Sequence, residues 1–164
     1  MSAKSEHLQI RVTPRQKAAL RRLAAAAGQD VSSYVLSRAL PPAERRFAEL
    51  IGLLGRGDEE PRYALAELND LLTGLGRDEL RDAVAHADVA RLSPWLANYV
   101  AAMVEQACAG KGVAPPGWAG RVAPLETPWF AAPLKSLRLY LLRASAVPFK
   151  RRNLFVDSSI GARV

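Results

Sequence analysis

The sequence predicts a mainly α-helical protein with one short strand near its N-terminus, and three observations lead to this fold class. Hydrophobic residues make up 49% of the 164 residues, which is enough for a buried core. Residues 7–12 alternate polar and apolar side chains, as a half-buried strand does. Most later segments repeat their apolar residues every three or four positions, the spacing of an amphipathic helix, until prolines interrupt the chain after residue 110.

The N-terminal strand exposes His7, Gln9 and Arg11 on one face and three aliphatic side chains on the other. A lone strand leaves a row of backbone groups unpaired, so the fold must supply a neighbour. The candidates are the same strand of a second copy, antiparallel about a two-fold axis, and the short segment 153–157 of the same chain. Because a forty-residue strand-helix-helix unit buries too little apolar surface alone, the second copy is favoured.

Two helices are expected directly after the strand. Thr13 is a suitable N-cap and Pro14 a suitable first residue for a helix that reaches Gly28, which tolerates the left-handed backbone that ends helices. Asp30 then caps a second helix over residues 31–40, and the prolines at 41 and 42 stop it.

This strand, these two helices, their lengths and the position of Gly28 resemble the ribbon-helix-helix (Arc/MetJ type) family of bacterial DNA-binding regulators and antitoxins. The resemblance covers residues 7–40 and implies a homodimer whose two-stranded ribbon enters the major groove of operator DNA. His7, Gln9 and Arg11 then read base edges, Arg binding guanine and Gln binding adenine.

The same resemblance implies a phosphate contact at the start of the second helix, where free amides favour an anion. These positions are Val31, Ser32 and Ser33. Asp30 departs from this chemistry, because a carboxylate caps the helix well but repels a phosphate.

The middle of the chain is expected to form a helical bundle. In the first helix, which begins after Pro42, the predicted inward residues are Phe47, Leu50, Ile51 and Leu54, and Gly55 and Gly57 end it. The further helices are predicted over residues 58–76, residues 78–92 and residues 94–109, the last capped by Ser93.

Nothing in this bundle predicts an enzyme. The candidate catalytic groups each have a structural explanation, as helix-dipole partners, an isolated histidine and a small packing residue: Asp78, Glu79, Asp82, His86 and Cys108. One cysteine excludes an internal disulfide and, with two histidines, predicts no metal site. We expect no cofactor.

The C-terminal part begins with a proline-rich connector over residues 111–133, predicted to be ordered but not helical. Its Trp118, Trp129 and Phe130 either pack on the bundle or anchor a partner, and packing is favoured. One more helix is predicted over residues 133–145, with Leu134, Leu137, Leu141 and Leu142 as its expected buried residues.

The segment from Pro128 to Asp157 is similar to the tails of some bacterial regulators that are paired with nucleotidyltransferase-like toxins. It implies an autorepressing antitoxin whose C-terminal part binds and neutralises a partner toxin. The residues expected to bind this partner are Trp129, Phe130, Lys150, Arg151, Arg152 and Phe155. The basic residues 150–152 are alternatively a second set of DNA phosphate contacts, or a solvated rim.

The distribution of charged residues also divides the chain into three parts. Residues 1–46 hold nine Lys/Arg against three Asp/Glu, residues 47–110 five against eleven, and residues 111–164 nine against two. Basic ends predict a polyanionic partner. We therefore expect three parts: a DNA-binding domain over 1–41, an acidic bundle over 42–110 and a partner-binding part over 111–164.

The sequence also predicts a cytosolic location, without membrane contact, because no apolar run is long enough to cross a bilayer and residues 1–7 lack a signal-peptide pattern. The alternative function is a helical adaptor that binds proteins and no DNA.

Overall fold

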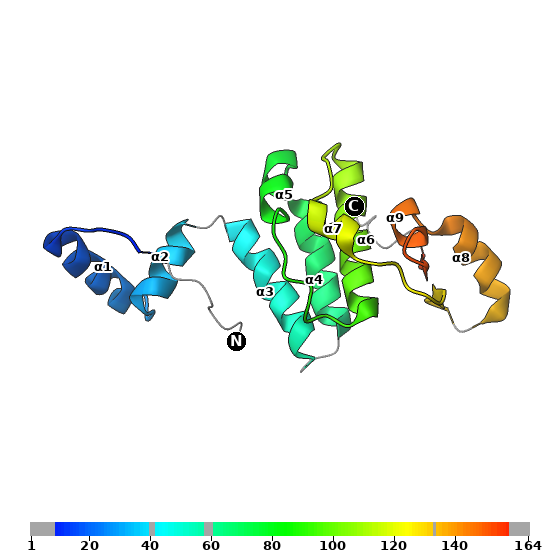
Figure 1. The fold of residues 1–164 in the computed structure, drawn as a ribbon, viewed down its shortest axis with the longest axis horizontal. Helices are drawn as coiled ribbons and strands as arrows, with labels where there is room; N and C mark the ends of the chain where they lie inside the picture. Colours follow the sequence, from blue (N-terminus) through cyan, green and yellow to red (C-terminus); the bar gives the residue numbers. More distant parts are fainter. Residues whose placement is uncertain (1–8, 40–41, 58–60, 133, 158–164) are drawn as a thin grey trace.

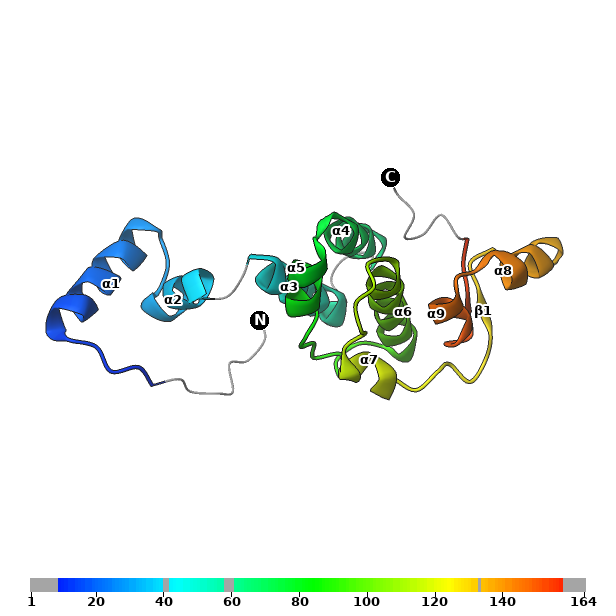
Figure 2. The same cartoon turned by 90° about the horizontal axis from the view of Figure 1, so that it is seen from above.

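The computed structural model describes residues 9–39, 42–57, 61–132 and 134–157, and the fold is mainly α-helical, as predicted. The first part contains α1 (Pro14–Ala26) and α2 (Val31–Ala39), and the middle contains α3 (Pro42–Arg56), α4 (Pro61–Gly74), α5 (Arg77–Ala83) and α6 (Pro94–Gly110). The C-terminal part contains α7 (Gly117–Arg121), β1 (Trp129–Phe130), the 3₁₀ helix η1 (Lys135–Leu137), α8 (Arg138–Ala144), α9 (Val147–Lys150) and β2 (Leu154–Phe155). Figures 1 and 2 show α1 and α2 on one side of the remaining helices and α8 at the opposite end.

The core lies between α3, α4, α5 and α6, with α7 and α9 packed on α6 (Figure 1). The four apolar residues predicted for α3 are all buried, so the helical spacing identified its inner face correctly. Helix α6 lies deepest, since its central residues are buried around most of its circumference. Its start is fixed as predicted, with the Ser93 hydroxyl accepting a hydrogen bond from the Leu96 amide at 3.3 Å.

Two helix ends in the middle differ from the prediction. Gly55 lies within α3, and only Gly57, with φ +69°, follows its last residue. Helix α5 ends at Ala83 instead of continuing to residue 92. The Val84 carbonyl instead accepts a hydrogen bond from Trp118 Nε1 at 2.8 Å, and the Asp88 carboxylate binds the Ala90 amide at 3.2 Å, so tertiary and turn contacts replace the helix.

The proline-rich connector contains a short helix, α7, which was not predicted. Its Trp118 is buried and its indole ring lies 6.5 Å from that of Phe47, centroid to centroid, so packing is confirmed for this tryptophan. One hydrophobic core therefore includes residues on both sides of position 110, although the division into three parts stays a prediction.

The short C-terminal strand is paired within the chain, but not with the N-terminal segment. β2 pairs in parallel with β1, with Trp129 opposite Leu154 and Phe130 opposite Phe155. The Trp129 amide donates to the Asn153 carbonyl at 2.8 Å, and the Ala131 amide to the Phe155 carbonyl at 2.9 Å. The segment considered as an alternative neighbour for residues 7–12 is thus occupied by β1.

Helix α8 buries only Leu141 of the four leucines predicted to face inward, so the expectation for Leu134, Leu137 and Leu142 was wrong. The helix is two turns long and contacts η1 and β2 along one side. Arg138 at its start lies over the Phe130 ring of β1, 5.0 Å from the centroid, and Lys150 of α9 donates to the Arg143 carbonyl near its end, while Leu139, Tyr140 and Leu142 are exposed. No helix of the described chain is both long and apolar enough to span a bilayer.

Candidate nucleic-acid interface

The segment before α1 is held at a fixed angle to the helix by its cap. The Gln16 amide donates to the Thr13 hydroxyl at 3.3 Å, and the Thr13 amide donates to Gln16 Oε1 at 2.9 Å. This reciprocal capping box satisfies two backbone donors at the helix start, and Thr13 itself is extended, with φ −70° and ψ 158°. The backbone at Thr13, where residues 9–12 join the helix, is therefore fixed by local hydrogen bonds.

The connection from α1 to α2 agrees with the prediction. Gly28 has φ +64°, a backbone conformation that costs side-chain-bearing residues energy, and the Gln29 amide closes the turn on the Ala24 carbonyl at 3.0 Å. Asp30 then caps α2, with its carboxylate accepting from the Ser33 amide at 3.0 Å and from the Ser33 hydroxyl at 2.5 Å. Ala24, where α1 faces α2, is 1% exposed.

The Asp30 cap changes the predicted phosphate contact. Because the Ser33 amide already binds a carboxylate, it is not available to a phosphate, and the negative charge of Asp30 lies at the helix end that an anion approaches. The prediction of phosphate contacts at Val31 and Ser32 stays open, and for Ser33 the structure favours the capping role.

The outer surface of this unit is strongly basic. Sequence positions 7–29 contain no aspartate or glutamate. The exposed cations are Arg11, Arg15, Lys17, Arg21 and Arg22. Such a surface has a positive field that attracts a polyanion, and each cation that neutralises a phosphate releases counterions.

The predicted base-reading residues lie at the edge of this basic surface. Gln9 and Arg11 are exposed, with side chains able to reach a ligand, and His7 lies outside the described residues. Residues 9–12 are not paired with any strand of the described chain. An intermolecular ribbon therefore stays a prediction that one copy of the chain does not test.

Aliphatic side chains on the same unit are also uncovered. Ile10 is 59% exposed, and the large hydrophobic residues exposed with it are Val12, Leu23, Val31 and Leu36. Burying such side chains stabilises by roughly 1.5–3 kcal/mol each, so their exposure in the single chain is costly. The unit therefore exposes both apolar and basic side chains in the single chain.

The residues predicted to bind a partner protein are placed differently from one another. Arg152 is buried and pairs with Glu105, Nη2 to Oε1, at 2.6 Å, while donating to the Ala119 carbonyl at 2.7 Å. Phe155 is also buried, with its ring 4.8 Å from that of Phe130. These contacts make Arg152 and Phe155 internal residues, which corrects the expectation that they meet a partner.

Four members of that set are at least partly accessible, and Phe130 among them is half-buried against Phe155. Trp129 is exposed at one edge and has its ring 5.1 Å from that of Trp95, while Arg151 is exposed and Lys150 is half-buried, donating from Nζ to the Arg143 carbonyl at 2.9 Å. The basic residues 150–152 are therefore not one uniform surface patch.

Sequence reasoning missed the accessible surface of α8. Its exposed large side chains, with those that flank it, are Leu134, Leu137, Leu139, Tyr140, Leu142 and Val147. A signal was present, since five leucines within residues 134–142 point around the whole helix, more than one buried stripe holds.

The candidate catalytic groups have structural contacts. The Glu79 carboxylate accepts from the Gly76 amide at 3.1 Å, and Asp78 and Asp82 each pair with Arg81 at 3.2 Å. Cys108 is fully buried, and burial, followed by the nearby Glu105 carboxylate, raises the pKa of its thiol, which disfavours the nucleophilic thiolate. In the described residues no three His, Cys, Asp or Glu side chains come together as a metal site.

Comparison with known proteins relates the N-terminal part of the chain to a family. Residues 3–77, a little under half of the chain, match the NikA-like family, described as mobilization protein NikA. The matched region includes the basic unit described above and continues through α3 and α4. No curated protein and no solved structure matches the chain significantly.

Proposed function

We propose that this chain is a non-catalytic, DNA-binding mobilization protein that acts as a dimer. Two copies pair residues 7–12 into an antiparallel ribbon, which enters the major groove of duplex DNA at the site where transfer of a mobilisable element begins. The match of residues 3–77 to a mobilization protein family supports the biological role.

One observation carries the DNA-binding mechanism. Residues 9–12 are exposed, precede a capped helix and lie on a unit whose exposed residues include both aliphatic and basic side chains. Pairing two such segments satisfies their backbone groups and covers Ile10 and Val12 at the same time. It leaves the alternate side chains His7, Gln9 and Arg11 pointing away from the helices, toward the groove.

In this proposal each side chain has a distinct role. The Arg11 guanidinium donates two hydrogen bonds to guanine O6 and N7, and the Gln9 amide pairs with adenine N6 and N7. The cations of α1 bind phosphates and set affinity without sequence preference. The amides of Val31 and Ser32 supply a further phosphate contact, weakened by Asp30.

The family match changes the biological setting that the sequence suggested. DNA binding is common to an antitoxin and to a mobilization protein, but the match names mobilization and gives no support to a toxin partner, nucleotidyltransferase-like or otherwise. We therefore propose DNA transfer, and not toxin neutralisation, as the process served.

The test is fluorescence-anisotropy titration of the purified chain with duplex fragments that tile the DNA around its own gene. We expect one fragment to bind more tightly than the others. Arg11→Ala should reduce that preference by about 1–3 kcal/mol, as removal of one bidentate base contact does. Arg62→Ala, which removes an equal charge from the exposed surface of α4, is the matched control and should leave the preference intact.

Two results contradict the proposal. Equal affinity for every fragment would exclude sequence-specific binding, and an unchanged preference in both Arg11→Ala and Gln9→Ala would exclude the ribbon as its source. Binding that does not weaken as salt rises would instead favour the adaptor alternative, because phosphate contacts release counterions.

The surface of α8 favours a second role, binding of a protein partner at the opposite end of the molecule. Its exposed leucines lie beside Lys135, Arg138 and Arg143, and positions 127–156 contain no acidic residue, while Asp157 accepts a hydrogen bond from the Tyr140 hydroxyl of α8 at 3.3 Å. We propose a partner with an apolar surface rimmed by carboxylates, which complements both features.

This second role is tested by co-expression with the protein products of neighbouring mobilization genes and by light scattering of the purified complex. Leu139→Glu with Leu142→Glu should dissociate a complex of defined mass while DNA binding is kept. Retention of the complex by this variant would exclude α8 as the interface.

A further inference from the structure

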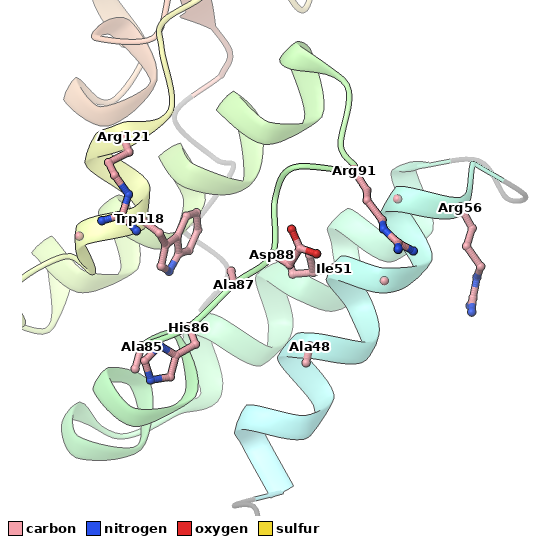
Figure 3. A pocket seen from close by; sticks show the side chains of 13 residues that line it. Ala48, Ile51, Arg56, Ala85, His86, Ala87, Asp88, Arg91, Trp118 and Arg121 are labelled. Carbon is pink, nitrogen blue, oxygen red and sulfur yellow. The ribbon is translucent and has the colours of Figure 1, made fainter. Parts of the chain in front are cut away.

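An open groove of about 850 Å³ lies in the middle of the molecule, apart from the N-terminal unit. It is bounded by α3, by the non-helical segment from Ala85 to Arg91 and by α7 (Figure 3). The groove exists because α5 ends at Ala83, so that the following residues cross the bundle as non-helical chain instead of covering it with another helical turn.

The charge of this groove is opposite to that of its surroundings. Residues 47–110 contain eleven acidic and five basic residues, yet the charged residues of this range that line the groove are Arg56, Arg91 and Asp88, and α7 adds Arg121. Other carboxylates of the bundle lie elsewhere in ion pairs, for example Glu49 and Glu67 with Arg46. The groove is therefore a local basic site within an acidic region.

Two of its arginines have unused donors. Within the described residues, the guanidinium groups of Arg91 and Arg121 make no ion pair or hydrogen bond with protein groups, in contrast to the paired Arg46, Arg81 and Arg152. Figure 3 shows Arg121 on the α7 side of the groove and Arg91 on the opposite side, with Trp118 and Asp88 between them. Each guanidinium offers a planar pair of donors that suits a phosphate.

Trp118 forms one wall of the groove and is held in place by two contacts, and two glycines line the α3 side. Trp118 is held by its hydrogen bond to the Val84 carbonyl and by its contact with Phe47. Gly52 and Gly55 line the α3 side, and a Cβ added at Gly52 would meet no atom within 4 Å. Packing therefore does not require a glycine at position 52, and a glycine within a helix is less stable than an alanine by roughly 0.5–1 kcal/mol. Its effect here is that no side chain projects from this position into the groove.

We propose that this groove binds the phosphodiester backbone of DNA as a second contact, in addition to the ribbon. Because Arg121 and Arg91 lie on opposite sides of the groove, successive phosphates of one strand that crosses it contact both in this proposal. The contact carries no sequence information and adds affinity only. The inference rests on the proposed function, because it assigns a further part of the chain to the same DNA.

The first experiment uses the full-length chain with Arg91→Gln and Arg121→Gln combined. Anisotropy titration with the preferred duplex, extended by flanking DNA, should show an affinity about tenfold lower at low salt. The slope of log K against log salt should become shallower by about 1 for each phosphate that the variant no longer binds. The preference between fragments should not change.

The matched control combines Arg62→Gln with Arg81→Gln, which removes the same charge from other exposed positions of the bundle. It should change the slope little, since those arginines lie outside the groove. An equal reduction in both double variants would show a general charge effect and overturn the proposal. Asp88→Asn keeps the side-chain oxygen that binds the Ala90 amide and should raise affinity; an unchanged affinity would also count against the groove.

A second readout separates the groove from the ribbon. The chain is treated with phenylglyoxal, which modifies free arginines, with and without duplex or single-stranded oligonucleotide of equal length, and modified sites are located by mass spectrometry. We expect duplex DNA to protect Arg91, Arg121 and Arg11 together. Protection of Arg11 alone overturns the groove and leaves the proposed function. Protection of Arg91 and Arg121 without Arg11 overturns the ribbon and leaves the groove as a DNA contact. Protection of Arg91 and Arg121 by the single-stranded oligonucleotide alone would overturn duplex binding in the groove and assign it to unpaired DNA.

Discussion

The middle of the molecule and its N-terminal unit differ in how completely they cover their own apolar residues. From α3 to α7 the described chain exposes one large hydrophobic side chain, Tyr63, whereas residues 10–36 expose five. Both regions contain capped helices, α1 and α2 in the N-terminal unit and α5 and α6 in the bundle. This difference indicates that the bundle buries its apolar residues within the single chain, whereas the N-terminal unit needs a further contact to cover its own.

The two regions also differ in the use of charge. In the bundle, several arginines pair with nearby carboxylates, as Arg46 does with Glu49 at 3.3 Å and Arg81 with Asp78 at 3.2 Å, so that these charges stabilise the single chain. In the N-terminal unit, basic residues accumulate without acidic neighbours at positions 7–29 and repel one another. Such a surface is suited to a polyanion and contributes little to folding.

The largest expected effect comes from opening the core of the bundle. Phe47→Ala removes a fully buried ring that packs against Trp118 and should lower the free energy of unfolding by about 3–5 kcal/mol. Leu36→Ala in the N-terminal unit is the contrasting variant and should cost under about 0.5 kcal/mol in dilute, monomeric protein. Urea denaturation followed by circular dichroism measures both, and similar decreases would remove the distinction between the regions.

An effect of similar size is expected at Arg152, whose charge is buried beside Glu105 of α6. Arg152→Met leaves the carboxylate of Glu105 and the side-chain oxygen of Asn98 without their partner, and should cost about 3–5 kcal/mol. The neighbouring, exposed Arg151→Met should change stability by no more than about 0.5 kcal/mol. If thermal unfolding shows the two variants to be equally stable, Arg152 is not the structural link that its contacts indicate.

An intermediate effect is expected from a variant that tests whether a second copy covers the apolar residues of the N-terminal unit. If two copies pair, Ile10→Ser should weaken the dimer by about 1.5–3 kcal/mol for each copy, because the side chain is buried only there. Sedimentation equilibrium measures the dimer constant, with Tyr63→Ser on the bundle surface as the control. A wild-type chain that stays monomeric at high concentration would contradict this expectation.

The smallest effect is expected at the Thr13 cap, where the N-terminal segment joins α1. Thr13→Ala removes the hydroxyl that binds the Gln16 amide and should destabilise the unit by about 1 kcal/mol, while Thr13→Ser should restore it. Amide hydrogen exchange in α1 reports this local change. Unaltered exchange in Thr13→Ala would mean that the hydroxyl is not what holds the start of the helix.

Much of the fold was predictable, because caps and apolar spacing are local. Thr13, Gly28, Asp30 and Ser93 mark helix ends, and the inward face of α3 follows from the spacing of four residues. The failures occur where a distant residue competes with a local pattern. The periodicity of residues 78–92 continues past Ala83, but the chain leaves the helix there, and Trp118, thirty-four positions after Val84, binds the Val84 carbonyl.

The candidate sites show the same division. The sequence alone determined that the first forty residues present a basic, alternating segment followed by two helices, since charge and periodicity are properties of neighbouring residues. Only the tertiary structure decided that Arg152 is internal, that the leucines of α8 are exposed and that Arg91 and Arg121 line one groove. Burial and proximity depend on which elements pack together, and residues thirty or more positions apart carry no local signal of their meeting.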